Sequence, residues 1–149
     1  MRDGRAAMQI EDEIKEMAET FGMLAEMGED AKYEYIIDLG KKLPPMPEAE
    51  ITEANKVRGC ISQVWLTHQL STDQPPRLQF NGTSDSTLVK GLIGLLLKIV
   101  SNRTPQEILS VDLRATFAKL GIENQISPNR RNGFVSMVER IKQLAAAQA

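Results

Sequence analysis

The chain has a single cysteine, Cys60, among its 149 residues. One thiol excludes an internal disulfide, a CxxC redox pair and a thiolate zinc cage. The single histidine, His68, leaves no set of ligands for a zinc site of the usual spacing. If the sulfur of Cys60 has a function, it acts by itself as a nucleophile or carrier, and its reaction partner lies on another molecule.

The chain also lacks a surplus of positive charge and a long apolar run. Its 18 basic and 20 acidic residues give a net charge of −2, so nothing predicts attraction to nucleic acid or anionic lipid. The longest apolar stretch, residues 92–97, is far shorter than the ~20 residues that a membrane span needs. No export signal is visible near the N-terminus. We therefore expect a cytoplasmic protein that binds neither nucleic acid nor a membrane.

The length is that of one domain, and we expect residues 1–149 to form it, with residues 1–8 and 146–149 flexible. Apolar residues at helical spacing predict helices at both ends of the chain. Residues 88–100 leave almost no polar face, which is typical of a central, buried helix. The apolar stripe of the first helix begins at Ile10, and capping residues and prolines place later helix starts near Asp30, Leu88, Thr104, Asp112 and Ser127.

The middle of the chain predicts a small sheet. From residue 62 the sequence alternates, with Val64, Leu66 and Leu70 on one face, and residues 77–82 form a second strand after Pro75-Pro76. A short strand at residues 55–57 leads toward Cys60. The predicted fold class is α+β, with an antiparallel sheet of about three strands packed against N- and C-terminal helices.

The neighbours of Cys60 weigh against a purely structural thiol. A lone cysteine is commonly a small buried hydrophobe. Here Gly59 permits a tight loop, Arg58 supplies a cation that favours thiolate, and the segment lies between two strand-like stretches where a loop presents its residues. His68 is not its base, because eight residues of strand span roughly 26 Å, and we expect an exposed strand residue there.

Two further polar residues are candidates for the surroundings of the thiol. Arg130 lies in the first turn of the last helix, where a cation opposes the helix dipole. The alternatives are a solvated helix start and an anion site in which Arg130 helps to hold a thiolate or persulfide. Asp85 precedes the buried helix, and we favour a role as its N-cap over one as a polar neighbour of the Cys60 loop or of a partner.

Four groups of motifs follow one another along the chain: Gly59-Cys60-Ile61-Ser62-Gln63-Val64-Trp65, then Ser84-Asp85 with Leu88-Val89-Lys90-Gly91-Leu92-Ile93, then Arg103-Thr104-Pro105-Gln106-Glu107-Ile108 and Leu120-Gly121-Ile122, then Ser127-Pro128-Asn129-Arg130 with Asn132-Gly133. In these motifs and their order, the sequence resembles the SufE family of sulfur acceptors from about residue 35 to 145. The chain departs from the family pattern at Gln125, where histidine is common, at Gly94, where alanine is common, and at Arg131, which replaces a small residue.

The resemblance implies a function and a fold. The family cysteine, matched by Cys60, accepts sulfane sulfur from a PLP-dependent cysteine desulfurase (SufS-like or CsdA-like) and passes it to an iron-sulfur scaffold (SufBCD-like). The family arginine is matched by Arg130. The implied fold is similar to that of the IscU scaffold. No cofactor is expected to be bound stably, since the PLP belongs to the desulfurase, and no metal site is expected. A CsdE-type acceptor, which serves a different desulfurase, shares these motifs.

One thiol suits a sulfur carrier, because a second cysteine would attack the persulfide and discharge it as sulfide. Between transfers the thiol should be sheltered from oxidation, so we expect Cys60 in a partly covered loop that opens on the partner. The chain is then an activator of a desulfurase rather than a free-standing enzyme. The alternatives are a protein-binding module with a structural cysteine and a thiol hydrolase, which lacks a histidine base within reach.

Overall fold

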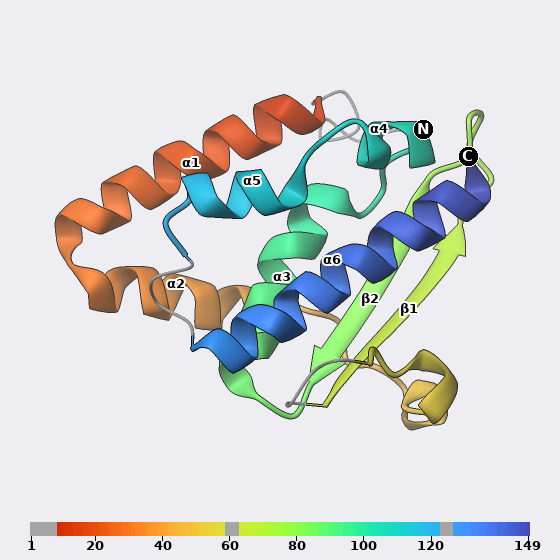
Figure 1. Ribbon diagram of the computed structural model, residues 1–149, viewed down its shortest axis with the longest axis horizontal. Coiled ribbons are helices and arrows are strands. Elements are labelled where there is room, and N and C mark those ends of the chain that lie inside the picture. Colours follow the sequence, from red (N-terminus) through yellow and green to blue (C-terminus); the bar gives the residue numbers. More distant parts are fainter. Residues whose placement is uncertain (1–8, 59–62, 123–126) are drawn as a thin grey trace.

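The computed structural model describes residues 9–58, 63–122 and 127–149. Helices surround a hairpin of two strands, which confirms the α+β class (Figure 1). The elements are α1 (Ile10–Met27), α2 (Glu29–Lys41), the short 3₁₀ turns η2 (Glu48–Glu50) and η3 (Glu53–Asn55), β1 (Val64–Leu70), β2 (Leu78–Ser84), α3 (Thr87–Val100), α4 (Pro105–Leu109), α5 (Leu113–Lys119) and α6 (Pro128–Gln148). In the described ranges no helix combines the length and apolar content needed to cross a membrane.

The sheet has two strands within the described ranges, where about three were predicted. β1 and β2 are antiparallel, and their register runs from Val64 opposite Ser84 to Leu70 opposite Leu78. The expected strand at residues 55–57 is reduced to one bridge between Lys56 and Trp65. Residues 53–55 wind into the η3 turn, which removes them from the ladder and leaves only the following residues extended.

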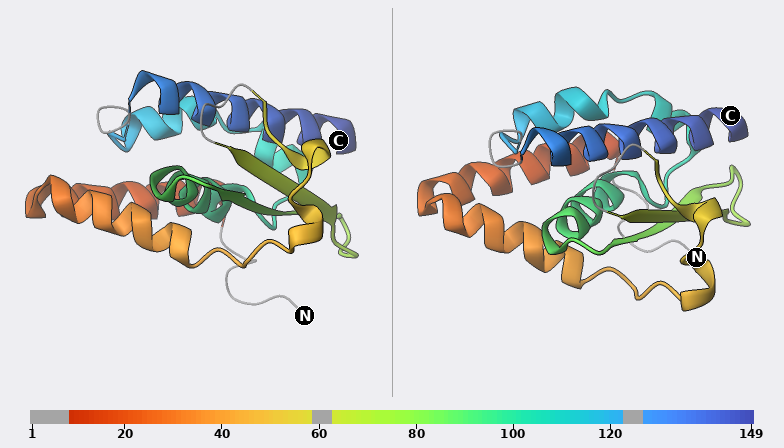
Figure 2. Two further views of the ribbon diagram at one scale, coloured as in Figure 1. Left: turned by 90° about the horizontal axis from the view of Figure 1, so that it is seen from below. Right: turned by 60° about the horizontal axis from the view of Figure 1, so that its bottom comes forward.

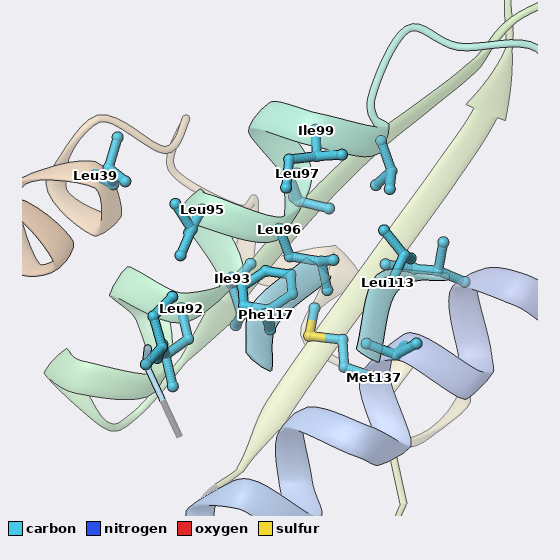
Figure 3. Packing of buried hydrophobic residues seen from close by; sticks show 14 of the residues in the cluster. Leu39, Leu92, Ile93, Leu95, Leu96, Leu97, Ile99, Leu113, Phe117 and Met137 are labelled. Carbon is cyan, nitrogen blue, oxygen red and sulfur yellow. The ribbon is translucent and has the colours of Figure 1, made fainter. Parts of the chain in front are cut away.

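Helix α3 lies at the centre of the molecule. Figure 2 shows it between the α1–α2 hairpin and α6, and it also packs on β2. Its side chains Leu95, Leu96 and Ile99 are fully buried, and Figure 3 shows them among residues of α2, α5 and α6. The nearly all-apolar composition of this segment therefore predicted its place correctly.

Glycines let α2 and α3 approach closely. A Cβ atom on Gly94 would lie 2.6 Å from the carbonyl oxygen of Leu39, and one on Gly91 would collide with the main chain of Ile36. These obstacles are backbone atoms, which cannot move aside as a side chain does. At these positions the main chains of α2 and α3 are in direct contact.

The helix caps confirm part of the prediction. Thr104 and Glu107 form a complete capping box, and the Asp112 side chain accepts a hydrogen bond from the Ala115 N–H at 3.1 Å. Asp30 is not a cap, because Gly28, at φ 109°, ends α1 and is followed directly by α2. At the other end of the chain, Ala145 is buried and α6 continues through Gln148. Residues 1–8, expected to be flexible, lie outside the described ranges.

Candidate functional site

Cys60 and Gly59 lie outside the described residues, whereas the chain on either side of them is described. The Val57 N–H donates to the carbonyl oxygen of Val64 at 2.8 Å. The adjacent residues Lys56 and Trp65 form the antiparallel bridge. The segment that carries the thiol therefore starts and ends at main-chain positions that are hydrogen-bonded to each other.

Asp85 joins the exit of this segment to the start of α3. Its Oδ1 accepts from the Gln63 N–H at 3.0 Å, and its own N–H donates to the Gln63 carbonyl oxygen at 3.2 Å. The predicted role of Asp85 as the α3 N-cap is wrong, because Ser86 holds that position and its Oγ accepts from the Val89 N–H at 3.3 Å. With Ser86 as the cap, the Asp85 carboxylate is available to hold Gln63.

Sequence reasoning missed Gln63 as part of the site. A signal was present in the run Ser84-Asp85-Ser86-Thr87, which holds more cap-forming residues than one helix start can use. A surplus carboxylate beside a cap is free to bind another backbone N–H. Its partner, however, is 22 positions away along the chain, so only the folded structure identifies it.

Three elements meet beside the start of β1. Val64 lines a small apolar cavity of about 10 Å³ together with Val89 and Leu92 from α3 and Gly133 and Phe134 from α6. The first turns of α6 therefore lie against the residue at which β1 begins.

The side chain of Arg130 is outside the description, but its position on α6 is defined. Residues three and four apart share a helix face, so Arg130 lies on the face that carries Gly133 and Phe134. That face is the one directed at Val64. The fold thus brings the backbone of Arg130 to the side of the molecule where the Cys60 segment ends.

Arg58, predicted to supply a cation, is 81% exposed and pairs with Glu53 at 3.7 Å. An ion pair this exposed contributes little to stability, and its cation stays accessible to other anions. Both residues border an open groove of about 560 Å³ between residues 53–58 and α6, which Lys56, Glu139 and Arg140 also line. The groove carries both signs of charge and runs along the entry side of the Cys60 segment.

Comparison with known proteins identifies the family. The sequence profile of the SufE family, described as an Fe-S metabolism associated domain, matches residues 15–145. The chain belongs to the SufE family. An uncharacterized SufE-like protein of Rhizobium meliloti (strain 1021) is 43% identical over 130 residues, which are 87% of this chain and 91% of that protein. A second, from Rhizobium etli, is 41% identical over 119 residues, 79% of this chain and 80% of that protein.

A solved structure shows the same fold. The solution structure of a hypothetical protein from Thermus thermophilus has a TM-score of 0.74 to this SufE-family chain, and the alignment covers 91% of this chain and 95% of that one. The two sequences are 18% identical, so the likeness concerns the fold alone.

The departures from the SufE pattern have different structural settings. Alanine is common in the family at the position of Gly94. Here a Cβ atom would meet the Leu39 main chain, so α2 and α3 lie too close together for alanine. Arg131 is half-buried and lines a cavity with Phe134. Gln125 lies outside the described residues.

His68 has the place that the sequence predicted. It is exposed on β1 opposite Phe80, four residues beyond Val64, which is about 13 Å along a strand. Its exclusion as a base for Cys60 stays a prediction. In the described part of this SufE-family chain, no three residues of the metal-binding types His, Cys, Asp and Glu gather into a site.

Proposed function

We propose that this SufE-family chain is a sulfur acceptor and carrier for iron-sulfur cluster assembly, with Cys60 as the carrier residue. The thiolate of Cys60 attacks the outer sulfur of a persulfide on a PLP-dependent cysteine desulfurase. A bond forms between that sulfur and the Cys60 sulfur, the S–S bond of the donor breaks, and the donor cysteine leaves as a thiolate. The carrier then delivers the sulfur to an iron-sulfur scaffold.

The observation that carries the proposal is the setting of the chain's only thiol. Cys60 belongs to a short segment of a SufE-family domain whose entrance and exit are hydrogen-bonded through Val57, Val64, Gln63 and Asp85. A segment held at both ends can present its middle to a partner without unfolding the sheet. A lone thiol also has no intramolecular rival that would discharge the persulfide.

Electrostatics support a reactive thiolate in this segment. The exit residue Gln63 is bonded to Asp85, one residue before the N-cap of α3, so the segment ends at a helix N-terminus with its partial positive charge. Positive charge favours thiolate over thiol. The Asp85 carboxylate opposes this effect, and Arg58 and Arg130 are the cations that would offset it.

The proposal is tested by weighing the protein after incubation with a cysteine desulfurase, PLP and cysteine. We expect an increase by one sulfur atom, removed by a reductant and absent from Cys60→Ser. An adduct of equal size on Cys60→Ser, or none on the natural chain with either a SufS-like or a CsdA-like desulfurase, would reject the carrier role.

Stimulation of the desulfurase is measured in the same reactions as alanine release. A carrier predicts that Cys60→Ala abolishes most of the stimulation, because the donor persulfide is no longer cleared. Stimulation that Cys60→Ala leaves unchanged would instead identify a binding module with a structural cysteine. Comparison of the two desulfurase types decides between the SufE and CsdE branches.

A further inference from the structure

The sequence contains two Asn-Gly pairs, Asn81-Gly82 and Asn132-Gly133. Asparagine is one of the thermolabile residues, and it is most reactive before glycine, which has no side chain to shield its backbone nitrogen. That nitrogen attacks the amide carbon of the asparagine side chain and closes a succinimide ring. Both pairs have the residues for this reaction, and the structure distinguishes them by the bonding of the glycine nitrogen.

The nitrogen of Gly133 belongs to the hydrogen-bond ladder of α6. The helical bonds already begin at Arg131, whose N–H donates to the carbonyl oxygen of Ser127 at 2.9 Å. Gly133 follows two residues later within α6, so its N–H is also a ladder donor. This hydrogen bond must break, and the helix must open locally, before the nitrogen can attack the side chain of Asn132.

The nitrogen of Gly82 lies outside the β1–β2 ladder. In β2 the N–H groups of Leu78 and Phe80 point away from β1 and donate to groups outside the hairpin. The direction of the N–H groups alternates along an antiparallel strand, so Gly82 also directs its N–H away from β1. Its acceptor there is the side chain of its own neighbour, Oδ1 of Asn81, at 2.9 Å.

This hydrogen bond holds the two reacting groups next to each other. Oδ1 is bonded to the amide carbon of Asn81, so the carbon that the nitrogen attacks lies one covalent bond beyond the contact. Reacting groups that are already held together need little further ordering to react. Asn81 is half-buried and lines an open groove of about 470 Å³, which gives water access to the side chain.

We propose that Asn81 is a deamidation site of this chain. The backbone nitrogen of Gly82 bonds to the amide carbon of Asn81 and gives its proton to water. The C–N bond of the side-chain amide breaks, and the amide nitrogen takes a proton from water and leaves as ammonia. A water molecule then opens the succinimide at either carbonyl carbon, which yields aspartate or isoaspartate.

The isoaspartate product should disturb the core. In isoaspartate the main chain runs through the side-chain methylene group, so β2 becomes longer by one atom directly before Gly82. Gly82 is packed tightly, since a Cβ atom there would lie 2.8 Å from Cγ2 of Ile93 and 3.4 Å from Cε of Met137. Figure 3 shows Ile93 and Met137 in the core. This packing explains the glycine, whereas nothing in it requires asparagine before it.

The test follows both pairs in one sample of the natural chain, kept folded in mildly alkaline buffer. Samples taken over time are digested, and the peptides are weighed for the exchange of an amide for an acid. We expect the Asn81 peptide to convert at least roughly fivefold faster than the Asn132 peptide, because a typical hydrogen bond protects Gly133 by about that factor. In urea the protection is lost, and the two rates should become similar.

Variants separate the site from its consequence. Asn81→Gln keeps an amide but forms a larger ring, so it should prevent conversion at this position. Asn81→Asp reproduces the aspartate product with a normal main chain and should unfold near the urea midpoint of the natural chain. Chains that carry isoaspartate at position 81, separated by ion exchange, should unfold at lower urea concentration than Asn81→Asp.

Three outcomes would overturn the inference. Conversion of Asn132 as fast as that of Asn81 in the folded chain would show that the bonding of the glycine nitrogen does not select the site. A folded chain that keeps Asn81 intact while the chain in urea converts would show that β2 protects it. Isoaspartyl chains as stable as Asn81→Asp would remove the effect on the core. The reaction does not involve Cys60, so its failure and that of the sulfur-carrier proposal are independent.

Discussion

Asp85 holds the main chain of Gln63 from both sides. Its carboxylate Oδ1 accepts from the Gln63 N–H at 3.0 Å, while its own N–H donates to the Gln63 carbonyl oxygen at 3.2 Å. One residue thereby ties the exit of the Cys60 segment to the start of the most buried helix. Because only the first of these bonds uses the side chain, substitution of Asp85 tests it without removing the second.

We expect Asp85→Ala to loosen the exit of the Cys60 segment. The Gln63 N–H loses its acceptor, and a bond of about 1 kcal/mol corresponds to roughly fivefold faster hydrogen exchange at that amide. Asp85→Asn keeps a neutral acceptor and should have a smaller effect. Asp112→Ala is the control, because Asp112 accepts from Ala115 in the same way at the start of α5. Unchanged exchange at Gln63 in Asp85→Ala would contradict the structure.

The close contact between α2 and α3 predicts that alanine substitution affects stability very differently at different glycines. Gly91→Ala and Gly94→Ala place a methyl group against the main chain of Ile36 and Leu39 and should each lower the free energy of unfolding by about 2–3 kcal/mol or more. Gly22→Ala in α1 meets nothing within 4 Å and should raise it by about 0.5–1 kcal/mol. Urea unfolding midpoints measure all three. Equal effects at Gly22 and Gly94 would rule out the close approach.

The environment of Lys142 on α6 should make the stability of the fold depend on pH. Its Nζ donates to the carbonyl oxygen of Ile108 at 2.8 Å and to that of Val111, which anchors α6 to the end of α4. Burial lowers the pKa of Lys142 below its ordinary value, and the nearby Asp112 carboxylate partly opposes this. The folded chain therefore binds fewer protons at this group than the unfolded chain in the window just below the ordinary lysine pKa.

The free energy of unfolding should therefore increase slightly as pH rises through that window, because the unfolded chain binds more protons at Lys142 there than the folded chain does. Lys142→Met removes this contribution and both hydrogen bonds, and should cost about 1–3 kcal/mol at neutral pH. Thermal unfolding from pH 7 to 10.5 measures both effects. Lys119→Met, at an exposed site on α5, is the control and should change neither. If the unfolding of Lys142→Met depended on pH in the same way as that of the natural chain, Lys142 would not be the source of the pH dependence.

What the sequence predicted well are features with a local cause. The burial of α3 follows from its composition, and the caps at Thr104 and Asp112 follow from residue type and spacing alone. The strands also follow from alternation, although Leu70, predicted to lie on the inner face with Val64 and Leu66, is 43% exposed. The last three residues of β1, His68, Gln69 and Leu70, are all exposed, so alternation there has no core to face.

What the sequence could not supply are choices between competing local options and contacts between distant residues. Asp85 and Ser86 are both good caps, and only the position of Gln63 decides which of them serves. The strand expected at residues 55–57 competes with a 3₁₀ turn of similar local stability. The meeting of Arg114 and Arg131 at one cavity depends on the packing of α5 against α6, which no local pattern encodes.

The position of Arg130 on α6 leads to a prediction about the reactivity of Cys60. The backbone of Arg130 is on the same helix face as Gly133 and Phe134, which line the cavity at Val64, where β1 begins. If it stabilises the thiolate, Arg130→Ala should move the pH profile of Cys60 alkylation by iodoacetamide to higher pH and slow persulfide loading, while Arg130→Lys should retain most of both. Lys119→Ala, which removes an exposed cation from α5, should change the alkylation profile little. Superimposable profiles for Arg130→Ala and the natural chain would leave the residue as a solvated helix start and remove it from the site.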